Sequence, residues 1–164
     1  MAVSFEEIES KIKGVILGVL GSIIASFSIA LGVSVLTSDR WTIIFSGLIV
    51  GIASSFANSL APLTSKSRLI SSRSFSKDDL WQVIISLVFT FVVVGLPLLP
   101  YPIMENLNIA RVISITTGLV LLFIFAGNKA QLENDSPIGY ALGIVTVGII
   151  IAALSYYIPL YFIK

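Results

Sequence analysis

The sequence predicts an all-α, multi-pass membrane protein with five transmembrane helices. Its composition is 56% hydrophobic and only 12% charged, and its mean hydropathy is +1.02. A water-soluble domain has about 25% charged residues. The 10 basic and 9 acidic side chains are therefore too few to cover the surface of a soluble domain of 164 residues. Several uncharged stretches also approach or exceed the roughly 20 apolar residues that cross about 30 Å of hydrocarbon as a helix.

Five apolar stretches account for most of the chain, and none contains Asp, Glu, Lys, Arg or His. The fourth is shorter than the others, but Arg111 and Lys129 can extend from its ends toward the two interfaces. Residues 1–13 precede the first stretch as a cytoplasmic amphipathic segment, and residues 14–163 form the transmembrane domain. The predicted spans are 14–36, 41–63, 80–104, 112–127 and 138–163.

The basic residues predict the orientation. Four of them, Lys66, Arg68, Arg73 and Lys77, lie between the second and third spans, and two more precede the first span. Because cytoplasmic loops are enriched in Lys and Arg, the N-terminus is predicted to be cytoplasmic and the C-terminus external. No organelle-targeting signal is visible, so a prokaryotic plasma membrane is the expected location. The basic second loop is suited to contact with anionic lipid headgroups.

The third span ends in three prolines, Pro97, Pro100 and Pro102. Proline removes a backbone donor and clashes with the preceding helical turn. We therefore expect the helix to break or kink near the outer interface, with Tyr101 at headgroup depth.

The composition also excludes several classes of function. The chain has no His and no Cys, so it has no imidazole or thiolate for zinc, haem or iron–sulfur ligation, or for His-dependent nucleophilic catalysis. No acid–base pair lies where the fold could preorganise it. We expect no enzymatic activity, no cofactor and no nucleic-acid partner.

Small residues recur at steps of three and four along the first two spans, a pattern typical of close helix packing. We interpret these faces as packing surfaces, either within the chain or across a homodimer formed through the first helix. The alternative is that they line a cavity for a substrate. The packing candidates are Gly14, Gly18, Gly21, Ala25, Ser28, Gly32, Gly47 and Gly51, and the candidates for oxygen ligands in a cavity are Ser22, Ser26, Ser55, Asn58 and Ser59.

An acidic cluster of Glu6, Glu7 and Glu9 precedes the first span. Apolar residues at helical spacing and acids placed before lysines indicate a solvated amphipathic helix on the cytoplasmic membrane surface. The alternative is a patch that collects metal ions.

Four segments carry recognisable motifs: Gly18 to Ser34, Gly51 to Ser59, Gly95 to Tyr101 and Gly127 to Leu132. They resemble motifs of the vacuolar iron transporter family, which are five-span carriers of ferrous iron and manganese. The third segment is similar to the P-L-L-P-Y ending of the family's third helix, and the fourth to the G-x-x-K-A-x-L exit of its fourth helix. The order of the motifs, the span count and the orientation all agree with the family.

The chain departs from the family where the resemblance places its metal ligands. The family's first-helix Asp aligns with Gly21. Its second-helix Met aligns with Ser55 or Phe56, its Glu with Ser59 or Leu60, and a further acid with Gly47 or Leu48. The loop between the second and third spans also lacks the Glu-rich metal-binding hairpin. The resemblance implies the family's architecture without its acidic ligands.

Three functions remain open from the sequence. The first is transport of a divalent metal ion, iron or manganese, through hydroxyl, amide and carbonyl oxygens in place of carboxylates. The second is a structural or interaction protein of the same fold that no longer transports. The third is a pore for a small neutral solute, which suits an uncharged, serine-lined path.

Overall fold

The computed structural model describes residues 5–60 and 77–163, with the side chains of residues 12, 15–57, 84, 85 and 87–163. These residues form helices and short turns and contain no strand, which confirms the all-α class. The helices are α1 (Phe5–Leu36), α2 (Arg40–Leu60), α4 (Lys77–Leu98), α5 (Pro100–Ile103), α6 (Leu107–Leu132) and α7 (Pro137–Phe162).

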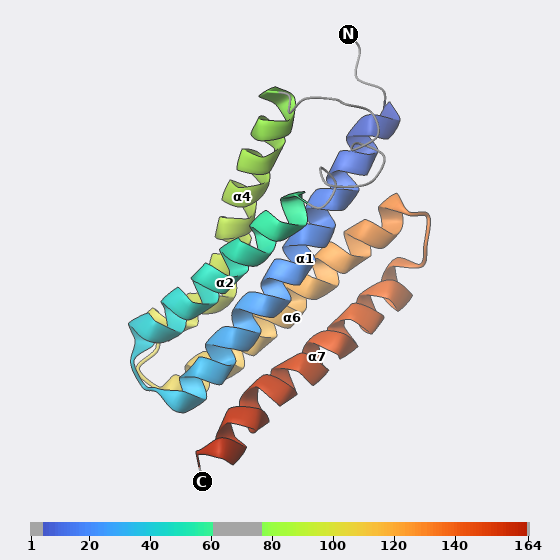
Figure 1. The fold of residues 1–164 in the computed structure, drawn as a ribbon. Coiled ribbons are helices and arrows are strands. Elements are labelled where there is room, and N and C mark those ends of the chain that lie inside the picture. The colour runs from blue at the N-terminus through green and yellow to red at the C-terminus, as the bar shows by residue number, and fades with distance from the viewer. Residues whose placement is uncertain (1–4, 61–76, 164) are drawn as a thin grey trace.

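Helix α1 is the centre of the bundle. It packs against all four of the other long helices, with α2 and α4 on one side and α6 and α7 on the other (Figure 1). Of its apolar window, 56% is buried, compared with 17% for α7. Helices α2, α6 and α7, with 28%, 28% and 17% of their apolar windows buried, therefore leave most of that apolar surface uncovered by the rest of the chain.

Four of the five expected spans correspond to helices that could cross a membrane by length and composition. Four helical segments are long and apolar enough to cross a membrane: Val15–Leu36, Arg40–Ala57, Leu107–Leu132 and Pro137–Phe162. The predicted third span lies in α4, a helix of 22 residues, in which the described apolar segment is Leu87–Leu98. The fifth crossing, the orientation and the homodimer remain predictions.

Helix α6 is longer than the predicted span 112–127 and includes both basic residues that were placed at its ends. Arg111 donates hydrogen bonds to the Ser34 hydroxyl at 2.9 Å and to Asn108 at 2.7 Å. Lys129 forms an ion pair with Glu133 at 2.6 Å and lies 4.7 Å from the centre of the Tyr140 ring. Because each charged side chain has polar or aromatic partners, the helix continues past it. The predicted span was too short because it was bounded by the two charged residues.

Short polar caps define the turns between the helices. The side chain of Asn106 accepts hydrogen bonds from two backbone N–H groups at the start of α6, and Ser136 accepts one from Gly139 at the start of α7. Asp39 caps α2 in the same way, and hydrogen bonds from Thr42 hold the pKa of the Asp39 carboxyl below its ordinary value. Such caps satisfy donors that a helix start leaves unpaired.

The prolines end α4 as expected, and the protein covers Tyr101, whose depth in the membrane remains a prediction. Helix α4 stops at Leu98, and the single turn α5 follows from Pro100. Tyr101, predicted to anchor at headgroup depth, is fully buried and packs with Leu98, Ala110 and neighbouring residues of α2. The turn of α5 directs the ring inward, so the protein and not the lipid surrounds it.

Helix α1 continues without a break from Phe5 to Leu36 over 32 residues. The segment expected to lie along the membrane surface is therefore helical, and its backbone extends the first span. At about 1.5 Å per residue, α1 is longer than the hydrocarbon core is thick.

Candidate functional site

The polar interior of the bundle lies where α1, α2 and α4 meet. At Gly51 of α2, an added Cβ would lie 3.1 Å from the Cβ of Ser26 in α1 and 2.5 Å from a methyl group of Val94 in α4. The second distance is shorter than real Cβ contacts allow. Glycine at this position therefore lets three helix backbones approach one another.

Four buried hydroxyls lie on the three helices that meet here, Ser22 and Ser26 on α1, Ser55 on α2 and Thr90 on α4, and we call them the hydroxyl cluster. Helices α1 and α2 are antiparallel, joined by a short turn (Figure 1). Ser26 faces Gly51, Ser22 lies one turn before Ser26, and Ser55 lies one turn after Gly51. Because the two helices are antiparallel, Ser22 and Ser55 lie at the same level along them. Each member of the cluster is at most 1% exposed.

Three of the four hydroxyls take part in hydrogen bonds. The Ser22 hydroxyl donates to the Gly18 carbonyl at 2.7 Å, and the Ser55 hydroxyl donates to the Thr90 hydroxyl at 2.9 Å, joining α2 to α4. The oxygens of Ser22 and Ser55 retain lone pairs that these bonds do not use.

The fourth hydroxyl, on Ser26, has no hydrogen-bond partner among the described residues, although it is fully buried. An unpaired buried polar group costs about 1–3 kcal/mol. A ligand or a water molecule that accepts from Ser26 or coordinates its oxygen would remove that cost.

Three of the five predicted oxygen ligands, Ser22, Ser26 and Ser55, are buried on α1 and α2. Asn58 and Ser59 lie near the end of α2, and their side chains fall outside the described set. Thr90 was not predicted. It is the only Thr or Ser in the apolar run from Leu87 to Leu98, and a single polar residue in such a run was the signal that could have identified it.

The small residues of α1 and α2 pack helices within the chain. An added Cβ at Gly32 would lie 3.0 Å from the Ser155 carbonyl of α7, and one at Gly47 would lie 3.1 Å from the Ser26 carbonyl of α1. Among the other candidates, Gly18 and Ser28 are buried, Gly21 and Ala25 are half-buried, and Gly14 lies outside the described side chains.

The described residues contain no group of three or more His, Cys, Asp or Glu side chains that could hold a metal ion. Glu6, Glu7 and Glu9 lie on the first turns of α1, and their side chains are not among those described. In the described interior the possible ligands are therefore neutral oxygens, which suit hard cations better than soft ones.

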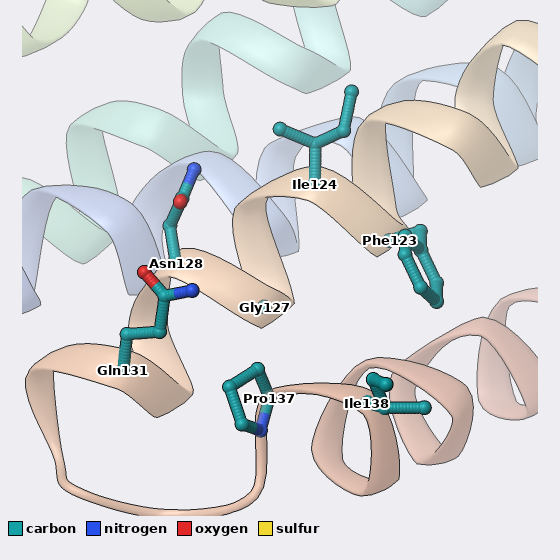
Figure 2. A pocket seen from close by; sticks show the side chains of 7 residues that line it. All are labelled: Phe123, Ile124, Gly127, Asn128, Gln131, Pro137 and Ile138. Carbon is teal, nitrogen blue, oxygen red and sulfur yellow. The ribbon is translucent and has the colours of Figure 1, made fainter.

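A separate hollow lies on the surface between α6 and the start of α7 (Figure 2). It has a volume of about 230 Å³ and is lined by Phe123, Ile124, Gly127, Asn128, Gln131, Pro137 and Ile138. None of these residues belongs to the hydroxyl cluster. The lining is mainly apolar, and it faces the surrounding medium.

The comparison with known proteins gives one match. Residues 64–159, more than half of the chain, match the model of the VIT family. No curated protein and no solved structure matches the chain. The matched range includes Thr90, and it leaves Ser22, Ser26 and Ser55 outside.

Proposed function

The chain belongs to the VIT family, the vacuolar iron transporters, and from this premise we propose that it moves a divalent metal ion, iron(II) or manganese(II), across the membrane. The family indicates a membrane metal transporter in general. The finer proposal concerns the ion and the altered chemistry that the missing carboxylates impose.

The observation that supports the proposal is the hydroxyl cluster with its unpaired member, Ser26. A transported ion needs oxygen ligands deep in the bundle, and here the ligands come from three helices that meet at Gly51. Ligands near the middle of the helices and at the junction of separate helices are typical of transporter sites.

Neutral ligands have a predictable cost. Moving a charge out of water is expensive unless an opposite charge compensates it, and none of the five predicted spans carries a carboxylate. We therefore expect weak affinity for the ion. We also expect little coupling to a proton gradient, because the spans offer no Asp, Glu or His to carry the proton.

The test is uptake of manganese(II) and iron(II) into proteoliposomes, with and without a pH gradient. We expect slow, saturable uptake that the pH gradient changes less than twofold. Ser26→Ala removes the unpaired oxygen with little change in packing and should lower uptake about tenfold, on the scale of one ligand to a charged group.

Thr146→Val is the matched control. Thr146 is exposed on α7, and its hydroxyl donates to the Leu142 carbonyl of its own helix at 2.8 Å, so its loss should leave uptake unchanged. Uptake that is strongly driven by protons would contradict the altered chemistry. If no metal uptake is measured, the result favours a structural or interaction protein of the same fold that does not transport.

A second candidate is a pore for a small neutral solute. The uncharged hydroxyl lining favours it, because hydroxyls can replace the hydrogen bonds of a neutral solute without an uncompensated charge. Swelling of proteoliposomes in glycerol or urea, abolished by a bulky Ser26→Leu substitution and accompanied by no metal uptake, would select this candidate.

The proposal includes the predicted homodimer, cytoplasmic N-terminus and prokaryotic plasma membrane. The half-buried state of Gly21 and Ala25 supports the dimer, because these residues remain partly accessible to a helix of a second copy.

A further inference from the structure

A second polar cluster lies at the C-terminal end of α1, beside α5 and α6. Arg111 of α6 reaches the last turns of α1, where its guanidinium donates hydrogen bonds to both the hydroxyl and the carbonyl oxygen of Ser34. A third bond goes to Asn108 at 2.7 Å. Arginine has five N–H donors, so two remain.

Two further donors in this region are unused. The hydroxyls of Tyr101 and Ser114 are buried without a hydrogen-bond partner among the described residues, and the two residues are 0% and 1% exposed. The Tyr101 hydroxyl lies near the hydroxyls of Ser34 and Ser114 and in the field of Arg111. The unpartnered hydroxyls of α5 and α6 therefore lie close to the guanidinium of Arg111.

The charge of Arg111 is only partly balanced. No carboxylate of the described residues forms an ion pair with it, since the described ion pair is Lys129 with Glu133. The C-terminal end of α1 supplies the equivalent of about half a negative charge. About half a positive charge therefore remains in a part-buried place that water screens poorly.

From these observations we propose that Arg111, Tyr101 and Ser114 form a binding site for a small inorganic anion of halide size. The two hydroxyls can donate as well as accept, the remaining N–H groups of Arg111 can only donate, and the net charge is positive, so an anion that accepts from all of them satisfies both requirements at once. A water molecule would satisfy only the first. Because Tyr101 and Ser114 are buried among packed side chains, a monatomic ion, which needs less room than a phosphate group, is the anion proposed.

The test is thermal unfolding of the purified full chain in detergent, in sodium chloride and in sodium gluconate at equal ionic strength. An anion that binds only the folded state raises the unfolding temperature in a saturable way. We expect chloride to raise it by about 2–4 °C over gluconate. Bromide should replace chloride and give an anomalous scattering peak near the Tyr101 hydroxyl.

Tyr101→Phe and Ser114→Ala each remove one free donor. Each should raise the half-saturating chloride concentration about tenfold, the scale of one hydrogen bond to a charged group. Thr116→Val on the same helix is the control, because Thr116 is exposed and donates to the Val112 carbonyl at 2.9 Å. It should leave the chloride dependence unchanged.

Two results would overturn the proposal. Equal unfolding temperatures in chloride and gluconate would mean that the donors meet only water. A stabilisation that rises with salt without saturating, and that persists in both donor variants, would be a general salt effect. If either variant fails to fold, the bromide peak in the unmodified protein still decides the question.

Discussion

At the scale of the residue, two glycines on neighbouring helices differ in what surrounds them. Gly51 faces Val94 and Ser26 so closely that an added methyl group would overlap a neighbouring side chain, whereas nothing lies within 4 Å of the corresponding position at Gly95 of α4. The first glycine is required by packing. The second is a helical position that carries only the conformational cost of glycine.

Substitution by alanine should therefore act in opposite directions at these two positions. Gly51→Ala should lower the free energy of unfolding by about 1–3 kcal/mol, the range for overpacking a filled interior. Gly95→Ala should raise it by about 0.5–1 kcal/mol, because alanine loses less backbone entropy in a helix. Chemical unfolding in mixed micelles measures the free energy of unfolding of both variants. If Gly95→Ala lowers it as much as Gly51→Ala does, the two glycines do not differ in packing as described.

At the scale of the element, the α6–α7 hairpin shows how a few residues set the geometry of two spans. Helix α6 ends at Leu132, and Asn134, two residues later, is in the left-handed region at φ 56°. The N–H of Asp135 then bonds the Ala130 carbonyl at 2.9 Å, and the N–H of Asn134 bonds the Gln131 carbonyl at 3.3 Å. This pair of bonds is the Schellman motif, in which Gly or Asn takes the left-handed position.

The left-handed backbone predicts the effect of two substitutions at Asn134. Asn134→Ala should destabilise the protein by about 1 kcal/mol, because a Cβ without a polar group disfavours this conformation. Asn134→Gly should be neutral or slightly stabilising. Unfolding temperatures of the two variants check this, and equal losses for Ala and Gly would mean that the Asn134 side chain itself is needed.

The elements also show how far sequence reasoning extended. Apolar stretches and proline positions predicted the helices and the end of α4, because these depend on local composition. The burial of Tyr101 and the full length of α6 depend on partners far along the chain, such as Ser34 for Arg111. The cluster was partly predicted because Ser22 and Ser26 repeat at helical spacing, and Thr90 was missed because its partner Ser55 lies 35 residues away.

At the scale of the whole molecule, the central position of α1 limits where a second copy can pack. Its most buried faces already contact α2, α4 and α6, and Gly32 is close to the α7 backbone. Ala25 is half-buried and Gly18 is buried. Ala25 is therefore the better position at which to disturb an interface without disturbing the fold.

Ala25→Leu should lower the mass of the protein in mild detergent from that of a dimer to that of a monomer, because leucine blocks close approach of two small-residue faces. Gly143→Leu is the control, since nothing lies within 4 Å of a Cβ at this position on α7. Light scattering measures the mass of both. A dimer that survives Ala25→Leu would place the interface on another face.

The course of the chain also decides how two copies can be joined. Helix α1 begins at one end of the bundle and α7 ends at the other (Figure 1). With the five crossings predicted from the sequence, the two ends lie on opposite sides of the bilayer, so a linker that joins two copies in tandem must return across it if both copies are to keep the same orientation. That return requires an added spanning helix of about 20 residues, and a short flexible linker would force the second copy to insert upside down.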